Sequence, residues 1–282
     1  LKLSRGLGDV YKRQLITLLM HEIVDIACNF TNERFDNDLD GVIHKAINNK
    51  ISKFGLICSR MIDLDKLLKI YNQYSKDMFF TIGVHPHHAS EINDEYLKKL
   101  HDAVNINNPH AIGETGLDFF RNLSTYEEQI YAFEEQIKIA INTNKPLFLH
   151  QRDSHNDFIK ILRKYSSDIN KKIVHCFTGT QEQLDDYLEL DCFIGITGWI
   201  CDAKRNIELR NAIKGIPLSK LMIETDCPYL IPKNIANKPK NNRNEPSYLN
   251  HIASEISELM DIDEEILRKQ TFKNSISFFN IE

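Results

Sequence analysis

Two segments of the chain decide its fold: KPLFLHQRD at residues 145–153 and KIVHCFTG at residues 172–179. Each begins with a short run of aliphatic or aromatic residues, reaches a histidine, and ends at a residue that favours turns. This pattern is typical of a buried β-strand that gives way to a loop. A segment of helical pattern separates the two, and a strand, a helix and a second strand in this order predict parallel pairing.

Six further segments have the same composition, and they cover residues 23–30, 54–58, 79–86, 110–118, 192–199 and 221–229. Helical patterns lie between them, and one of these begins with Ser124 or Thr125 as its capping residue. Eight strands that alternate with helices predict an α/β fold, a TIM (β/α)8 barrel, as a single domain over residues 20–282. The alternative is an open doubly wound sheet, which usually carries a glycine-rich loop after its first strand, whereas CNFTNERF at residues 28–35 has no glycine.

The composition is that of an ordinary globular protein. Of the 282 residues, 42% are hydrophobic and 27% are charged, and the net charge is -5. Such a chain has no overall basic field that attracts nucleic acid, so a polyanionic substrate would need metal ions and local basic side chains. The six cysteines form no CxxC pair, which predicts a reduced, cytoplasmic protein in which Cys176 and Cys227 pack in strands rather than act as nucleophiles.

The first residues have a different character from the rest. LKLSRGLGDVYKRQ at residues 1–14 is basic and broken by glycine, and LITLLM at residues 15–20 is shorter than the apolar region of a signal peptide. We predict that residues 1–19 are an extraneous extension and that the natural chain starts at Met20. No apolar run reaches the length of a membrane-spanning helix, so we expect no membrane partner.

Four predicted strands end in side chains that can bind metal ions: Glu114, His150, His175 and Asp226. In α/β barrels the carboxyl ends of the strands meet at one face, where active sites are built. Two carboxylates and two imidazoles are a suitable ligand set for a divalent metal. Glu114 lies between two glycines, which permit a close backbone approach. Asp226 has a competing interpretation as a turn residue before Pro228.

Two aromatic side chains near the predicted strand ends have open interpretations. His85 in GVHPHH is expected to point into the barrel mouth and contact substrate phosphate or a metal-bound water. The alternative is a structural histidine, or a histidine-rich tract that binds metal adventitiously. Trp199, the only tryptophan, could stack on a base or line the rim of the barrel.

Basic side chains near three predicted strand ends are candidates for binding substrate phosphate: Arg121, Arg152 and Arg243. A guanidinium group can grip a phosphate or a carboxylate with two parallel hydrogen bonds. For Arg152, an ion pair with Asp118 or Asp153 is an equally valid interpretation. For Arg243, an unremarkable surface loop is the alternative.

Seven motifs together resemble the TatD-type metal-dependent nucleases in order and spacing: GVHPH, IGETGLDFFRN, FLHQRD, IVHCFTGT, IGITGW, IETDCPYL and RNEP. The similarity extends from residue 25 to about residue 280. The stretches DIACNFT and IGITGWICD are similar to the TatD deoxyribonuclease subgroup in particular. The resemblance implies a TIM barrel of the amidohydrolase type. It also implies metal-dependent hydrolysis of DNA, from the 3′ end of single strands, in a cytoplasmic protein that serves DNA repair or degradation.

The resemblance also implies roles for particular residues. Metal binding transfers to Glu114, His150, His175 and Asp226, and catalysis to Asp226, Glu114 and His85. Single-stranded DNA is the implied partner, with RNA as the alternative. We expect the protein to act as a monomer.

The first predicted strand departs from the pattern of many family members. They carry His-x-His at its end, whereas this chain has Ala27 and Asn29 at these positions and keeps Asp25. Fewer imidazoles leave a larger share of oxygen ligands, which favours Mg²⁺, then Mn²⁺, over Zn²⁺. Two alternatives stay open: an ester or amide hydrolase of the same superfamily, and a non-catalytic binding protein with a degenerate metal site.

Overall fold

The computed structural model describes residues 21–282, so the predicted extension of residues 1–19 and the start at Met20 lie outside the described residues. Its strands are β1 (Ile23–Cys28), β2 (Ile51–Leu56), β3 (Met78–Ile82), β4 (Ala111–Asp118), β5 (Leu147–Arg152), β6 (Lys172–Val174), β7 (Phe193–Ile196) and β8 (Leu221–Ile223). They form one sheet of eight strands in sequence order, each parallel to the next. This order confirms the TIM barrel and excludes the doubly wound sheet, in which the strand order reverses.

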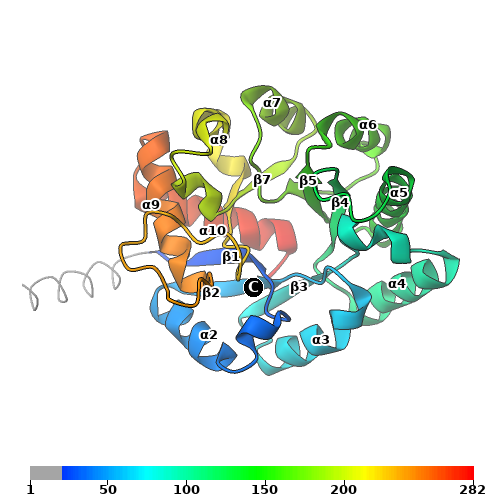
Figure 1. The fold of residues 1–282 in the computed structure, drawn as a ribbon, viewed down its shortest axis with the longest axis horizontal. Coiled ribbons are helices and arrows are strands. Elements are labelled where there is room, and N and C mark those ends of the chain that lie inside the picture. Colours follow the sequence, from blue (N-terminus) through cyan, green and yellow to red (C-terminus); the bar gives the residue numbers. More distant parts are fainter. Residues whose placement is uncertain (1–20) are drawn as a thin grey trace, which may run out of the picture.

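Helices surround the barrel (Figure 1): α2 (Leu39–Asn48), α3 (Leu64–Gln73), α4 (Asp94–Asn107), α5 (Tyr126–Thr143), α6 (His155–Tyr165), α7 (Gln181–Glu189), α8 (Ile207–Ala212), α9 (Leu249–Met260) and α10 (Glu264–Phe279). Helix α5 begins where its sequence predicts, because Thr125 and Glu128 form a reciprocal capping box. Within residues 21–282, no helix combines the length and the apolar character needed to cross a membrane.

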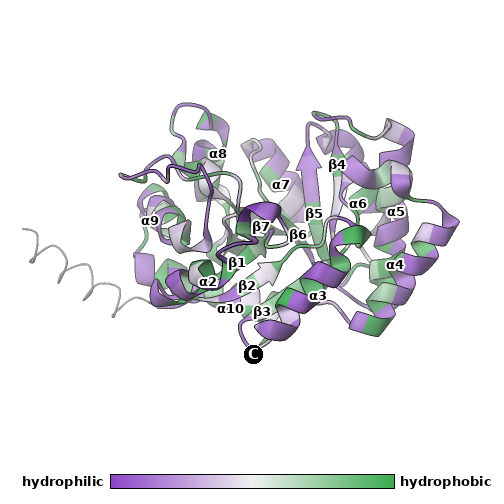
Figure 2. Ribbon diagram, turned by 60° about the horizontal axis from the view of Figure 1, so that its bottom comes forward, coloured by the Kyte–Doolittle hydropathy of each residue, from purple (hydrophilic) through white to green (hydrophobic). Residues whose placement is uncertain are grey.

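The apolar interior has two parts. One lies between the strands and the outer helices, which carry both hydrophobic and hydrophilic residues (Figure 2). The other fills the barrel near the amino ends of the strands, where Phe79 and Phe148 contact the aromatic rings of Phe279 from α10. Because this end is packed solid, the space for a ligand lies at the carboxyl ends of the strands.

Short contacts join β8 back to β1 and bring the last strand beside the first. The backbone N–H of Asp226 donates to the carbonyl of Ala27 at 3.1 Å, and that of Asn29 donates to the carbonyl of Cys227 at 2.9 Å. Asp226 is in the left-handed region, with φ of 53°, so the chain turns sharply here. The junction therefore places Asp226 beside the end of β1.

Two glycines let β4 lie against β5 and hold Glu114 between them. Gly113 and Gly116 have φ values of 148° and 145°, which favour glycine. A Cβ atom on Gly116 would lie 1.9 Å from the carbonyl oxygen of His150, and one on Gly113 would lie 2.2 Å from that of Phe148. Only glycine at both positions allows the backbones to approach this closely.

Candidate metal centre

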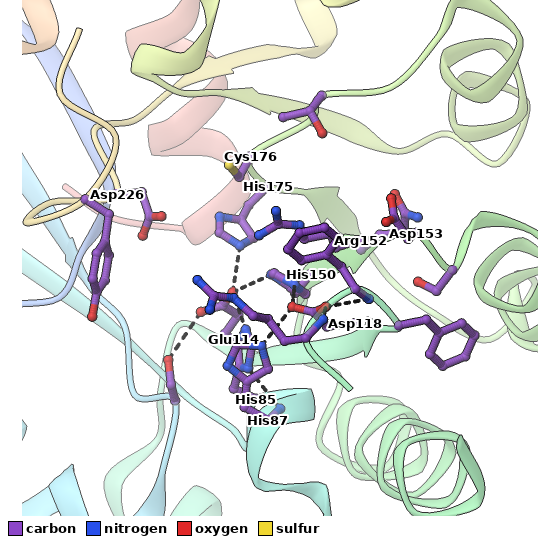
Figure 3. A pocket seen from close by; sticks show the side chains of 18 of the residues that line it. His85, His87, Glu114, Asp118, His150, Arg152, Asp153, His175, Cys176 and Asp226 are labelled. Atoms are coloured by element: carbon purple, nitrogen blue, oxygen red, sulfur yellow. Dashed lines mark hydrogen bonds and ion pairs between the residues drawn. The ribbon is translucent and has the colours of Figure 1, made fainter. Parts of the chain in front are cut away.

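Glu114 is the hub of a cluster of imidazoles at the carboxyl ends of the strands (Figure 3). Its Oε1 atom lies 2.7 Å from Nε2 of His175, 3.0 Å from Nδ1 of His150 and 3.4 Å from Nε2 of His85. The second oxygen accepts a hydrogen bond from the Ser59 hydroxyl at 3.2 Å. The structure thus brings together one predicted carboxylate and three predicted histidines, which come from β4, β5 and the ends of β6 and β3.

Asp118 and His87 extend this cluster, although neither is among the predicted site residues. Asp118 Oδ2 lies 2.8 Å from Nε2 of His87 and 3.4 Å from Nε2 of His150. Asp118 is only 1% exposed and stands four residues after Glu114 on the same strand. The alternation of side chains along a strand puts both carboxylates on one face, and that signal could have revealed Asp118.

Asp226 lies across the cavity from the histidine cluster (Figure 3). Its Oδ1 atom accepts a hydrogen bond of 2.8 Å from the side-chain amide of Asn29. Asn29 therefore fixes the orientation of the Asp226 carboxylate, which lies in the loop after β8. The two residues are 197 positions apart, so the local sequence around Asn29 does not reveal this contact.

The buried acidic and basic groups around the cavity have strongly shifted pKa values. Burial alone would raise the pKa of Glu114, but His175, His85 and His150 outweigh it and hold that pKa well below its usual range. Burial opposes the charged form of His175, yet Glu114 and Glu224 raise its pKa well above the usual value. Burial dominates at Asp226 and raises its pKa to about 7. One carboxylate is therefore firmly ionised, while the other titrates near neutral pH.

His85 is held in a particular tautomer. Its Nδ1 atom accepts a hydrogen bond of 3.1 Å from the backbone N–H of His87. Burial lowers the pKa of His85 to about 4, so the ring is neutral and its single proton is on Nε2. His85 consequently presents a hydrogen-bond donor toward Glu114.

The donor set fits a divalent cation. The ligand atoms of Glu114 and His150 lie within 4.8 Å of one another and of Nε2 of His85, which carries a proton and borders the pair as a hydrogen-bond donor. The nitrogens that face Glu114 are Nδ1 of His150 and Nε2 of His175, while the opposite nitrogen of each ring faces a second carboxylate, Asp118 at 3.4 Å and Glu224 at 3.5 Å. The chemistry of these groups, carboxylate with imidazole, is that of protein sites for divalent metals.

A cavity of about 1230 Å³ opens above the cluster. Arg121 and Arg152 lie on its rim and are exposed to solvent. The guanidinium of Arg152 packs over the ring of Phe120, 3.8 Å from its centre. The structure gives Arg152 no ion pair with Asp118 or Asp153, so the structural alternative for this side chain is not observed.

Arg243 does not reach this cavity, and its predicted contact with phosphate is corrected. The residue is only 6% exposed. Its guanidinium donates to both oxygens of Asp38, each at 2.7 Å, and to Glu245 at 2.9 Å. The remaining donor, Nε, is buried without a partner among the described residues, so no part of the guanidinium faces the cavity. Arg243 instead ties the loop after β8 to the start of α2.

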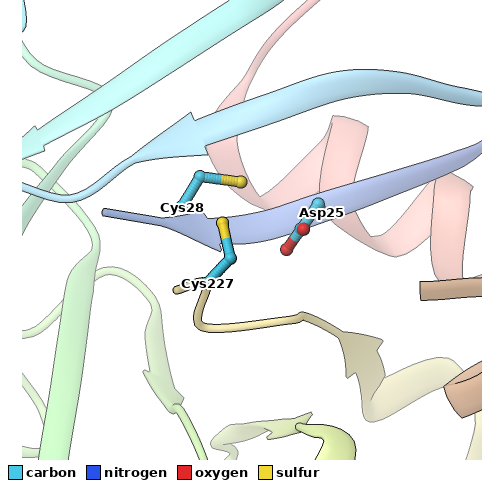
Figure 4. A group of neighbouring side chains, drawn as sticks. All are labelled: Asp25, Cys28 and Cys227. Carbon is cyan, nitrogen blue, oxygen red and sulfur yellow. The ribbon is translucent and has the colours of Figure 1, made fainter. Parts of the chain in front are cut away.

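Asp25, Cys28 and Cys227 form a separate buried group at the junction of β1 and β8 (Figure 4). Asp25 accepts hydrogen bonds from the backbone N–H of Thr225 at 2.9 Å and from its hydroxyl at 2.5 Å. Burial raises the pKa of both thiols. Cys227 packs in the junction as predicted, and burial raises the pKa of Cys176 to about 12, which leaves it a poor nucleophile.

Comparison with known proteins agrees with this geometry. The model of the family "TatD related DNase" matches residues 24–280. The "3′-5′ ssDNA/RNA exonuclease TatD" of Pectobacterium atrosepticum is 39% identical over 91% of this chain and 99% of that protein. A relative with the same name from Edwardsiella piscicida is 38% identical over 92% of this chain and 100% of its own length.

Solved structures show the same architecture. A TatD family hydrolase from Entamoeba histolytica aligns with a TM-score of 0.83 and 29% identity, over 92% of this chain and 98% of that chain. A TatD homologue from Escherichia coli aligns with a TM-score of 0.85 and 23% identity, over 92% and 98% of the two chains. The family model spans almost all of the described residues, and the resemblance of the motifs is confirmed. The chain belongs to the TatD-related DNase family.

Proposed function

We propose that this protein is a divalent-metal-dependent nuclease that removes nucleotides from the 3′ end of single-stranded DNA, with RNA as a second substrate. One observation carries the proposal: a firmly ionised Glu114 lies among three imidazoles at the floor of a large cavity. Relatives that align over nearly their whole length are named as 3′-5′ exonucleases of single-stranded DNA and RNA. Their names support the same substrate class here.

Glu114, His150, His175 and Asp226 would hold the metal in this proposal. The bound cation would polarise the phosphate, neutralise its charge and make water a better nucleophile. The mixture of oxygen and nitrogen ligands, without a histidine pair on β1, supports Mg²⁺ or Mn²⁺ over Zn²⁺.

Two residues would handle protons and hydrogen bonds around the reacting phosphate. Asp226 would accept a proton from the attacking water. Asn29 holds one of its oxygens at 2.8 Å and so fixes the orientation of the carboxylate. His85 would donate from Nε2 to a non-bridging phosphate oxygen, since its Nδ1 already accepts from His87.

Arg121 and Arg152 would bind phosphates that flank the scissile bond. Both are exposed on the rim of the cavity, and a net charge of -5 makes such local cations necessary for a polyanion. The ring of Phe120 supports the Arg152 guanidinium and limits the orientations it can take.

The direct test is cleavage of a 5′-labelled single strand by the full chain in Mg²⁺, in excess EDTA, and with Glu114→Gln. We expect a ladder of products that shortens from the 3′ end in Mg²⁺, and no cleavage in the other two reactions. Cleavage that persists in EDTA, or an active Glu114→Gln variant, would contradict the proposal. The cytoplasmic location, the monomeric state and a role in DNA repair stay predictions from the sequence.

A further inference from the structure

A second hollow of about 330 Å³ adjoins the main cavity, between the loop after β7 and the loop after β8. The two share lining residues: Trp199, Arg205, Tyr229 and Leu230. Trp199 belongs to a short 3-10 helix, Gly198–Cys201, which directly follows β7. The hollow therefore extends the cavity away from the metal centre and over the β7–β8 side of the barrel.

The backbone around this hollow is tightly packed, so its shape is built in. A Cβ atom on Gly198 would lie 2.2 Å from the carbonyl oxygen of Leu230 and 3.1 Å from the ring of Pro232. Glycine thus lets the two loops touch. The backbone N–H of Trp199 donates a hydrogen bond of 3.4 Å to the Thr197 hydroxyl, and the side-chain amide of Asn206 donates to the backbone carbonyl of Trp199.

The lining of the hollow suits a nucleotide. Trp199 is partly exposed, and Tyr229, on the other loop, is 50% exposed, so both offer aromatic surface. The Arg205 guanidinium lies 4.8 Å from the centre of the Trp199 ring and is held there by an ion pair of 2.6 Å with Asp202. Three lining residues are cationic and one is acidic: Arg34, Arg205, Lys233 and Asp202. The whole chain has a net charge of -5, so the positive charge of this surface is confined to the hollow and does not reflect the protein as a whole.

We propose that this hollow, which we call the Trp199 subsite, binds a nucleotide on the 5′ side of the scissile phosphate. A base would stack on Trp199, and Lys233 and Arg34, which form no ion pair among the described residues, would attract the phosphate. The inference rests on the proposed function. The 3′-terminal nucleotide would occupy the main cavity next to the metal centre, so the adjoining hollow would receive the strand on the 5′ side of the scissile phosphate.

The chain offers a direct probe, because Trp199 is its only tryptophan. We would titrate the full chain, in EDTA to prevent cleavage, with a labelled ten-nucleotide thymidine strand. Trp199 emission reports stacking, and anisotropy of the label reports binding. We expect the strand to quench Trp199 emission until the signal saturates, with the same midpoint in strand concentration as the change in anisotropy. Lys233→Gln should weaken binding and lower the dependence on salt by about one released counterion, because Lys233 lines the hollow and is exposed.

Turnover in Mg²⁺ supplies the second measurement. Base stacking on an aromatic side chain is typically strong enough that Trp199→Ala should lower kcat/KM for the ten-nucleotide strand, relative to a dinucleotide, by roughly tenfold. Trp199→Phe should restore most of this preference for length. Tyr131→Ala is the matched control, because Tyr131 is an exposed aromatic residue on α5, 42% exposed, that lines neither hollow.

The outcomes separate this inference from the proposed function. Binding by anisotropy without a change in Trp199 emission would overturn the subsite, as would an equal loss of kcat/KM on both strand lengths. Quenching without cleavage in Mg²⁺ would refute the nuclease activity and leave the subsite intact. Neither quenching nor anisotropy change would overturn the subsite, whatever the cleavage assay shows.

Discussion

Replacement of Arg243 by alanine should destabilise the protein rather than weaken its contact with a strand. The guanidinium is held by Asp38 and Glu245 and also donates to the carbonyl of Arg34 at 2.5 Å. These contacts fasten the loop after β8 to the segment that follows β1. Alanine removes all of them and leaves the space of the side chain empty.

The cost can be worked out contact by contact. A hydrogen bond to a charged group contributes about 1.5–3 kcal/mol when it is protected from water. The Glu245 side chain, 10% exposed, meets this condition, whereas the Asp38 side chain is 52% exposed and its two bonds must be discounted. Glu245 also keeps Lys45 at 2.7 Å, so its charge does not become isolated. We therefore expect a loss of about 3 kcal/mol in the free energy of unfolding.

Urea denaturation followed by circular dichroism measures this loss, provided that the slope of unfolding free energy against urea concentration is the same in the variant and the wild type. Arg163→Ala is the matched control. Arg163 also bridges two carboxylates, Asp186 and Glu189, but its side chain is 48% exposed, so we expect a loss below about 1 kcal/mol. The reasoning is refuted if Arg243→Ala unfolds like the wild type while its KM for single-stranded DNA rises, because Arg243 would then serve as the phosphate contact.

Two further perturbations test the account of the barrel. Burial raises the pKa of Asp25 in the folded protein to about 7, from a usual value of 3.8. Protonated Asp25 therefore contributes its full share to the free energy of unfolding below a pH of 3.8, and this contribution is lost as the pH rises through about 7. Between about pH 4 and pH 8, the wild type should therefore lose more unfolding free energy than Asp25→Asn, and parallel pH curves of urea denaturation would contradict this. Gly116→Ala places a methyl group 1.9 Å from the His150 carbonyl oxygen, at a φ of 145°. It should lower the free energy of unfolding by at least about 2 kcal/mol, whereas Gly41→Ala, with nothing within 4 Å, should not; equal stability of the two variants would argue against the close β4–β5 contact.

The strands could be predicted from the sequence because each buried parallel strand reads as a short apolar run. Their lengths could not. The segment 221–229 reads as one extended stretch, but β8 ends at Ile223, and the backbone of Asp226 turns into the left-handed region with φ of 53°. This turn depends on contacts with β1, which are distant in sequence, so the local pattern does not contain it.

The site was predictable where a residue's position on its strand determines its neighbours. Glu114 and His150 lie within the adjacent strands β4 and β5, and the barrel brings His175, at the end of β6, beside them. The prediction that Arg243 binds phosphate is wrong, because Arg243 instead binds Asp38, which is 205 residues away in the sequence. Side-chain partners at such separations follow from the fold and not from a local motif.

The central claim is that Glu114 anchors a divalent metal on which cleavage depends. Its most direct test titrates the metal-free protein with Mn²⁺ and follows, in the same samples, bound Mn²⁺ by electron paramagnetic resonance and cleavage of a single strand. We predict that activity rises in step with Mn²⁺ bound to the wild type, and that Glu114→Gln shows neither. Full cleavage before any Mn²⁺ binds, or wild-type affinity and activity in Glu114→Gln, would contradict the claim.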